Sequence, residues 1–197
     1  RRPTHQGGDK RRGMAVLTLA NQLTLLRMLL IPAFVILTAY QYLGWALAAF
    51  VLAGVTDLLD GVIARWWKQR TTIGAWLDPA ADKLLLLTAF VVLTLPDLGL
   101  TNRLPIWLTV VVISRDVGIV LTVAVVNLAI GPRTFEPSVY GKVATAVYIV
   151  TGVVTMSFNY LERPSGLVDV CIYASAGMAV VSGLHYIARV ARTVDNT

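Results

Sequence analysis

The chain has 197 residues, of which 56% are apolar and only 14% are charged, and its mean hydropathy is +0.69. This composition excludes an ordinary soluble domain and predicts a membrane protein. The formal net charge of +6 suits a protein beside anionic lipid headgroups, and we expect no nucleic acid among its partners.

Six apolar segments of spanning length follow one another along the chain and predict an all-α, polytopic membrane fold. Turn-forming residues separate the segments, and an even number of spans places both chain ends on one side of the membrane. We assign residues 1–20 to a basic tail or interfacial helix, 21–192 to the six-helix membrane domain and 193–197 to a C-terminal tail. The segments run at about 21–40, 45–67, 79–97, 105–129, 142–160 and 167–190.

Basic residues predict how these segments are oriented. They gather in the N-terminal tail, after the second segment, between the fourth and fifth segments and after the sixth, whereas the opposite loops contain only Arg103 and Arg163. By the positive-inside rule, the chain ends face the cytoplasm, together with a polar cavity between the helices. A bacterial inner membrane is the expected location. The mitochondrial inner membrane, with the site facing the matrix, is the alternative.

A polar stripe marks the cytoplasmic end of the first segment, where Asn21, Thr24 and Arg27 recur at every third position. Such a stripe either caps and anchors the end of the helix, or it lines the cavity and contacts a bound nucleotide or diphosphate. Arg27 is the strongest candidate of the three for a ligand contact.

Four aspartates lie in the second segment and at the start of the third: Asp57 and Asp60 are three residues apart, and Asp78 and Asp82 are four apart. On helices, these spacings place each pair on one face, so two helices can direct four carboxylates at one point. Ionised carboxylates crowded together at low dielectric need cations. Because no His or Cys is nearby, these oxygen ligands favour Mg²⁺, Mn²⁺ or Ca²⁺ over zinc or copper.

The residues between the aspartates have the features of a diphosphate site. Gly61 and Ala64 leave a strip beside Asp60 where a bulky ligand can approach the backbone. Arg65 suits bidentate contact with a phosphate. The alternative is that the acids form surface ion pairs with basic neighbours such as Lys83, but acids inside a membrane segment are functional by default.

The whole pattern, D-x-x-D-G-x-x-A-R-x(8)-G-x-x-x-D-x-x-x-D, resembles the signature of the CDP-alcohol phosphotransferase family. The resemblance implies an integral membrane enzyme, usually a homodimer, that transfers a phosphatidyl or similar group from a CDP-linked donor to an alcohol and releases CMP. It also implies two bound divalent ions, Mg²⁺ or Mn²⁺, and a role for the last aspartate in deprotonating the acceptor hydroxyl. The matching positions are Asp57, Asp60, Gly61, Ala64, Arg65, Gly74, Asp78 and Asp82.

The same resemblance divides these positions by role. The four aspartates are the expected metal ligands, and Asp82 is also the expected catalytic base. The donor, which we expect to be CDP-diacylglycerol, is contacted by the other signature residues and by the stripe on the first segment. These donor-binding candidates are Gly61, Ala64, Arg65, Gly74, Asn21, Thr24 and Arg27.

The acceptor is predicted from the fourth and fifth segments. Arg115 and Asp116 either form a structural ion pair, or Arg115 binds an anionic group of the acceptor, with Lys142 and Arg133 as further candidates. The runs I-S-R-D-V and G-K-V-A-T are similar to the cardiolipin synthase branch of the family, which uses phosphatidylglycerol. The phosphatidylglycerophosphate synthase branch, which uses glycerol 3-phosphate, tends to carry a second arginine that is missing here before Arg133.

We therefore expect metal-dependent phosphatidyl transfer from CDP-diacylglycerol to a glycerol-type acceptor, with phosphatidylglycerol as the leading acceptor and glycerol 3-phosphate as the alternative. An ion-coupled membrane transporter is the alternative of another class, since transporters also place acids at helix breaks. A transporter has no need of Gly61, Ala64 and Arg65 at their observed offsets from the aspartates.

Overall fold

The structure, a computed structural model, describes residues 19–67, 72–130 and 139–195. Within these ranges, side chains are not described for residues 57–67 and 72–82 or for several residues near helix ends, Asn21 and Thr24 among them. The described residues form helices and no strand, which confirms the all-α prediction. The helices are α1 (Leu19–Ala39), α2 (Leu43–Trp67), α3 (Thr72–Thr94), α4 (Ile106–Ile130), α5 (Val139–Tyr160) and α6 (Gly166–Asp195), with a short 3-10 turn, η1 (Pro96–Leu98).

The helices follow the predicted segments closely except at the start of α3. This helix begins at Thr72, well before the predicted segment start at residue 79. Hydropathy marks only the apolar part of a helix, whereas backbone hydrogen bonding continues through the polar signature residues. Most of the predicted N-terminal tail lies outside the described residues, as do residues 196–197 at the other end.

Three helices are long and apolar enough to cross a membrane, and they lie in the second half of the chain. In the part of the chain that the structure describes, α1, α2 and α3 contribute shorter apolar stretches. The stretches in α2 and α3 end next to residues 57–82, whose side chains lie outside the described part. The three spans are Ile106–Val123, Val139–Tyr160 and Gly166–Val190, and the shorter stretches are Leu25–Ala39, Leu43–Thr56 and Lys83–Thr94.

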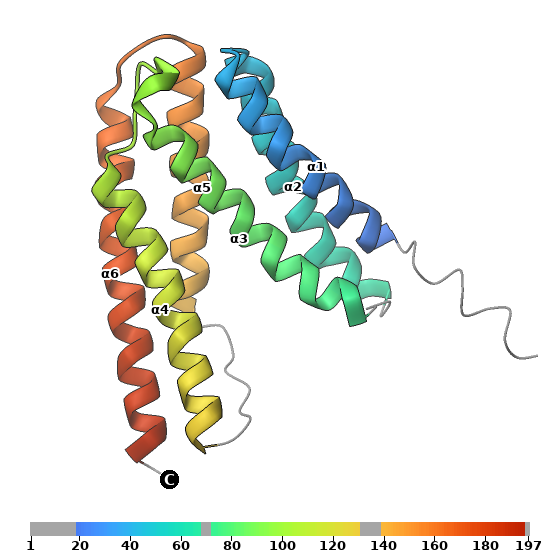
Figure 1. Cartoon of the computed structure of the whole chain (residues 1–197), viewed down its shortest axis with the longest axis vertical. Helices are drawn as coiled ribbons and strands as arrows, with labels where there is room; N and C mark the ends of the chain where they lie inside the picture. Colours follow the sequence, from blue (N-terminus) through green and yellow to red (C-terminus); the bar gives the residue numbers. More distant parts are fainter. Residues whose placement is uncertain (1–18, 68–71, 131–138, 196–197) are drawn as a thin grey trace, which may run out of the picture.

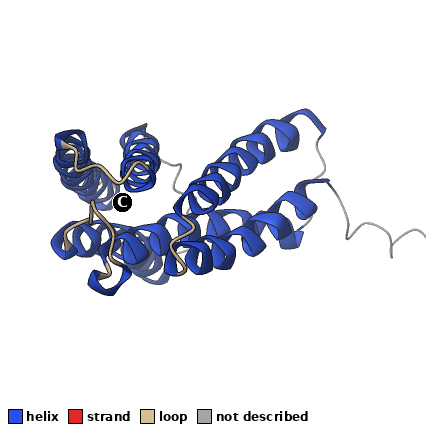
Figure 2. Cartoon of the chain, turned by 90° about the horizontal axis from the view of Figure 1, so that it is seen from above, coloured by secondary structure: helices blue, strands red, loops and turns tan. Residues whose placement is uncertain are grey.

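The helices form two arms that meet at one end and diverge toward the other (Figure 1). One arm contains α1, α2 and α3, with α1 packed against both of the others, and the second contains α4, α5 and α6. The view from above shows the same separation, with α1 to α3 extending away from the rest (Figure 2). The aspartate-bearing parts of α2 and α3 lie at the diverging end, as do the end of α4 and the start of α5.

Aromatic rings fill the region where the two arms touch. Phe34 of α1 and Phe50 of α2 have ring centroids 5.6 Å apart. Gly152 of α5 faces Phe50 so closely that an added Cβ would lie 2.8 Å from that ring. One turn away on α5, the ring of Tyr148 meets Phe90 of α3 edge to face at 5.7 Å. These contacts bind α5 to both α2 and α3.

Short polar contacts between helices supplement this apolar packing. The hydroxyls of Thr94 in α3 and Thr109 in α4 share a hydrogen bond of 2.6 Å. Those of Thr151 in α5 and Ser175 in α6 share one of 2.7 Å. Small hydroxyl-bearing residues allow close helix approach and supply hydrogen bonds in an apolar surrounding.

The end where the arms meet is held by a clamp that we define as Asn102, Asn159, Arg163 and Ser165. The backbone N–H of Asn102 donates to Asn159 Oδ1 at 2.7 Å, and Asn159 Nδ2 donates to the Asn102 carbonyl at 2.9 Å. The Asn102 side chain donates to the Arg163 carbonyl at 2.8 Å and accepts from the Ser165 N–H at 3.1 Å. The clamp therefore joins the α3–α4 connection to the α5–α6 turn.

Candidate active site

The signature aspartates lie on two consecutive helices. Asp57 and Asp60 are in the second half of α2, and Asp78 and Asp82 are in the first half of α3. The helix α1 packs against both of these helices. The side chains of all the signature residues, Gly61 to Gly74 included, lie outside the described part, so the convergence of the four carboxylates stays a prediction.

Arg27 is the member of the polar stripe whose side chain is described. It is fully buried on α1, the helix that packs against both aspartate-bearing helices. A buried guanidinium within a membrane domain marks a functional polar site by default. The position is compatible with the predicted donor contact, whereas the side chains of Asn21 and Thr24 lie outside the described part.

The metal prediction depends on the aspartates alone. Among the residues whose side chains are described, no three His, Cys, Asp or Glu residues lie close enough together to hold a metal ion. The four aspartates carry only hard carboxylate oxygens, which fit Mg²⁺ or Mn²⁺. Their distribution over two neighbouring helix segments fits a site built from more than one element.

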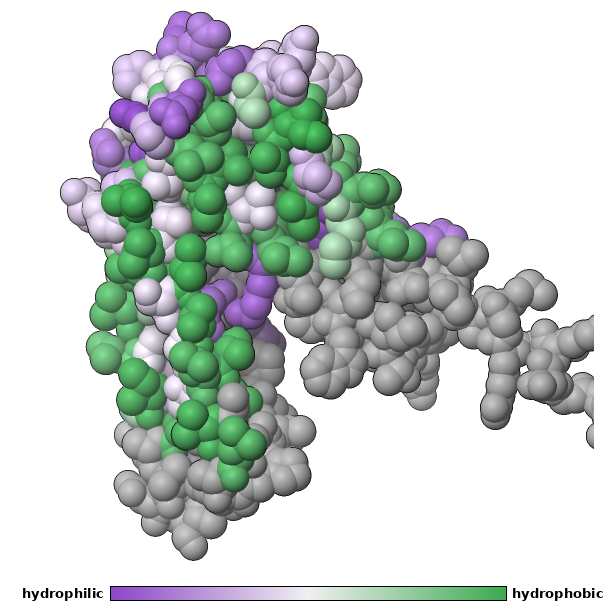
Figure 3. Space-filling view, in the orientation of Figure 1, coloured by the Kyte–Doolittle hydropathy of each residue, from purple (hydrophilic) through white to green (hydrophobic). Residues whose placement is uncertain are grey.

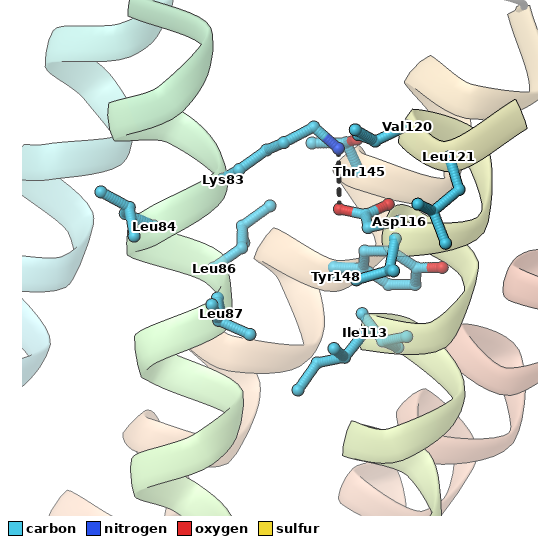
Figure 4. Close-up of a pocket in the computed structure, with 12 residues that line it drawn as sticks. Lys83, Leu84, Leu86, Leu87, Ile113, Asp116, Val120, Leu121, Thr145 and Tyr148 are labelled. Atoms are coloured by element: carbon cyan, nitrogen blue, oxygen red, sulfur yellow. Dashed lines mark hydrogen bonds and ion pairs between the residues drawn. The ribbon is translucent and has the colours of Figure 1, made fainter. Parts of the chain in front are cut away.

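An ion-pair network begins directly after the last aspartate, and we call it the α3–α4 network: Lys83, Arg115, Asp116 and Ser182. Lys83 Nζ lies 2.9 Å from Asp116 Oδ2, and Figure 4 shows the two side chains reaching toward each other from α3 and α4. Arg115 Nη1 lies 2.6 Å from Asp116 Oδ1. Arg115 Nη2 donates a hydrogen bond to the Ser182 hydroxyl of α6. One carboxylate therefore holds two cations.

Exposure differs sharply between the two cations. The Arg115 side chain is 9% exposed, that of Asp116 is 32% exposed and that of Lys83 is 48% exposed. Arg115 is therefore held between α4 and α6. The side chain of Lys83 extends from α3 toward Asp116 and is partly exposed.

A cavity of about 480 Å³ lies beside this network, between α3, α4 and α5. Figure 3 shows hydrophilic side chains within the hollow that separates the two arms. Most of the wall is aliphatic: Leu84, Leu86, Leu87, Val112, Ile113, Val117, Val120 and Leu121. The polar lining residues are Lys83, Asp116, Thr145 and Tyr148.

Comparison with known proteins decides the family. Residues 17–187 match the sequence profile of the CDP-alcohol phosphatidyltransferases. The protein belongs to this family. The match confirms the resemblance carried by the signature and makes the chain an enzyme, a CDP-alcohol phosphatidyltransferase of phospholipid biosynthesis.

Similar proteins carry two different names. A probable phosphatidylglycerophosphate synthase of Mycobacterium tuberculosis (strain ATCC 25618 / H37Rv) is 32% identical, covering 91% of this chain and 84% of its own length. A cardiolipin synthase (CMP-forming) of Homo sapiens is 37% identical over 74% of this chain, which spans about half (53%) of the human protein. One of Streptomyces coelicolor is 38% identical over 57% of this chain and 53% of its own length. The names of the relatives therefore do not distinguish between phosphatidylglycerol and glycerol 3-phosphate as the acceptor.

The predicted acceptor residues of this phosphatidyltransferase have different positions. Arg115 lies beside the cavity and forms the predicted ion pair with Asp116. Lys142 is exposed in the first turn of α5 and is not among the residues that line the cavity. Arg133 lies outside the described residues.

The α3–α4 network contains two residues that sequence reasoning did not assign to the transferase site. Lys83 directly follows Asp82, and this position of a cation next to the predicted catalytic base could have identified it as a site residue. Ser182 gave no signal, because its contact with Arg115 joins residues 67 positions apart. Sequence reasoning treated Asp116 as the partner of Arg115 alone, whereas the structure shows that it serves both cations.

Proposed function

We propose that this transferase moves the phosphatidyl group of CDP-diacylglycerol to a hydroxyl of phosphatidylglycerol, forming cardiolipin and releasing CMP. The observation that carries the choice of acceptor is the charge of the α3–α4 network. Lys83 and Arg115 share the single counter-ion Asp116, which leaves one net positive charge. A phosphodiester with one negative charge matches that surplus, whereas the phosphate dianion of glycerol 3-phosphate, the alternative acceptor, asks for more cations.

The donor occupies the polar region formed by α1, α2 and α3 in this proposal. Arg27 and Arg65 bind the diphosphate and orient it, because planar guanidinium groups match phosphate oxygens. Gly61 and Ala64 leave the backbone of α2 open to the nucleotide. Asn21, Thr24 and Gly74 complete the predicted donor contacts.

Asp82 accepts the proton of the acceptor hydroxyl as its oxygen attacks the phosphatidyl phosphorus. A new oxygen–phosphorus bond forms, and the bond between that phosphorus and the bridging oxygen of the diphosphate breaks, so CMP leaves with the bonding electrons. Two divalent ions held by Asp57, Asp60, Asp78 and Asp82 supply charge neutralisation on the diphosphate when bound. We place no covalent enzyme intermediate on this path, since the signature positions include no Ser, Thr or Cys.

The proposal includes the orientation and the assembly of the protein. The aspartate segments of α2 and α3 lie at the same end of the fold as the start of α5, whose first turn contains Lys142. The positive-inside rule favours the cytoplasmic side for that end, where a water-soluble nucleotide is released. We place the enzyme in a bacterial inner membrane, as a homodimer.

Product identification tests this function. The full chain in lipid nanodiscs receives CDP-diacylglycerol, Mg²⁺ or Mn²⁺, and either phosphatidylglycerol or glycerol 3-phosphate, and the lipids formed are identified by mass spectrometry. Cardiolipin and stoichiometric CMP are the expected products. Phosphatidylglycerophosphate as the sole product would overturn the choice of acceptor, and ion flux without any CMP release would favour the transporter.

A further inference from the structure

The cavity between α3, α4 and α5 has the size and lining of a ligand site. Its volume of about 480 Å³ lies within the range of about 300–1,000 Å³ that is usual for ligand pockets. Eight of its twelve lining residues are aliphatic. The few polar groups lie together, at the Lys83–Asp116 ion pair and at Tyr148 and Thr145 (Figure 4). Such a division suits a molecule with an apolar chain and a small charged head.

The carboxylate of Asp116 occupies a position suited to another anion. Its Oδ1 receives Arg115 at 2.6 Å and its Oδ2 receives Lys83 at 2.9 Å. A phosphodiester oxygen also carries part of a single negative charge, so it can accept from Lys83 in place of Asp116 Oδ2. The position beside Lys83 therefore forms a cradle for a monoanionic group, and Asp116 Oδ2 occupies it in the free protein.

Two buried donors beside the cradle lack a protein partner. Among the described residues, Arg115 Nε and the hydroxyl of Tyr148 are buried and make no hydrogen bond. Tyr148 itself is only 2% exposed, and its ring lies below the Lys83–Asp116 pair in Figure 4. Buried polar groups are normally satisfied, so these two donors point to a ligand that supplies acceptor atoms.

We propose that the cavity binds an acyl chain of the acceptor phospholipid, and that the acceptor's phosphodiester takes Lys83 away from Asp116. This inference rests on the proposed function and deepens it. Lys83 is the cation that changes partner, because it is half exposed and its flexible stem starts on α3. Arg115 stays with Asp116, because it is nearly buried and is bound to Ser182. Asp116 therefore remains neutralised when Lys83 leaves.

This arrangement selects for a lipid acceptor through two separate contacts. Lys83 recognises the charge of the phosphodiester, and the aliphatic wall recognises the chain. Glycerol 3-phosphate has no chain to place in the cavity. Lys83 directly follows Asp82 in α3, so the residue that holds the acceptor and the proposed catalytic base belong to the same turn of this helix.

The charge contact is tested with Lys83→Gln, Lys83→Arg and the control Arg103→Gln, which removes an exposed cation far from the cavity. Initial rates are measured at varied phosphatidylglycerol with saturating CDP-diacylglycerol, and then at varied CDP-diacylglycerol with saturating phosphatidylglycerol. Lys83→Gln should raise the KM for phosphatidylglycerol about tenfold, equivalent to about 1.4 kcal/mol, and leave the KM for the donor within about twofold. Lys83→Arg should restore most of the affinity. The proposal would be overturned if Lys83→Gln raised the KM for CDP-diacylglycerol as much as the KM for phosphatidylglycerol. It would also be overturned if the KM for phosphatidylglycerol did not rise.

The chain contact is tested by filling the cavity. Val120 lines it and Val110 does not, although both lie on α4 and are similarly exposed, at 57% and 54%. Val120→Trp should raise the KM for phosphatidylglycerol and leave that for CDP-diacylglycerol unchanged, whereas Val110→Trp should alter neither. If Val120→Trp raises only the KM for CDP-diacylglycerol, the cavity binds the acyl chains of the donor and the proposal is wrong.

A readout without turnover separates this proposal from the proposed function. Native mass spectrometry of the full chain counts phosphatidylglycerol molecules that stay bound after release from detergent. The parent chain should retain one more lipid than Val120→Trp and Lys83→Gln, even if no acceptor supports CMP release and the proposed function fails. Equal retention by all variants would overturn the cavity assignment while leaving the transfer reaction intact.

Discussion

Gly152 of α5 and Phe50 of α2 are in such close contact that any side chain on Gly152 would overlap the ring. An added Cβ would lie 2.8 Å from one ring carbon and 3.0 Å from another. Phe50 is 2% exposed and also packs on Phe34, so it has little room to move. This contact sets the distance between the two arms where they touch.

We therefore expect Gly152→Ala to destabilise the protein by about 1–3 kcal/mol, the usual cost of overfilling a packed core. Thermal unfolding in detergent measures the change. Gly177→Ala is the matched control, because its added Cβ meets no atom within 4 Å and alanine is the better helix former. An unchanged melting temperature for Gly152→Ala would show that α2 and α5 separate at low cost.

The aspartates should differ in what their removal does. We expect Asp82→Asn to lower kcat by about 10²–10⁴, the range for loss of a general base, while the donor still binds. Asp57→Asn and Asp78→Asn should in addition raise the metal concentration needed for half-maximal activity. Asp97→Asn, in η1 at the far end of the fold, is the control. Full activity in the three signature variants would refute the site.

Asp116 should be needed for stability. Asp116→Asn leaves Arg115, which is 9% exposed, without its counter-ion inside the membrane domain. Removing one partner of a buried pair costs about 3–5 kcal/mol, and we expect about 1–3 kcal/mol here because the carboxylate is 32% exposed and water screens part of the effect. Unfolding temperatures of Asp116→Asn and the double variant Asp116→Asn/Arg115→Met provide the measurement. Recovery of stability in the double variant is expected, and an equal loss in both would contradict the ion-pair explanation.

The clamp should stabilise the fold without influencing acceptor choice. Asn159→Ala leaves the backbone N–H and carbonyl of buried Asn102 without partners, which costs about 1–3 kcal/mol for each group. We expect a lower unfolding temperature and an unchanged ratio of KM values for the two lipids. Thr101→Ala, at an exposed neighbouring position, is the control. A shift in acceptor KM would indicate that the clamp affects the cavity.

The sequence predicted the helices well, because apolar runs of spanning length separated by turn residues have few alternative structures. It placed the start of α3 too late. The apolar run begins only after Asp78, whereas the helix already begins at Thr72.

Parts of the site were accessible from sequence for physical reasons. An ionisable residue in an apolar segment is conspicuous, which is how Arg115 and Asp116 were identified. The partnership of Lys83 with Asp116 was not accessible, because it joins positions 33 residues apart and depends on how α3 and α4 pack. Neither was the contact with Ser182, a residue type too common in helices to attract notice.

The wall of the cavity has one further consequence. Leu84, Leu87, Val117, Val120 and Leu121 line the cavity and are also 38–58% exposed. The cavity is therefore open at the protein surface between apolar side chains, which suits contact with the hydrocarbon of a surrounding bilayer. In the proposed reaction, the acceptor enters through this opening with its acyl chains still in the hydrocarbon, and the larger product leaves through the same opening. No hydrophobic tail has to cross water in a catalytic cycle.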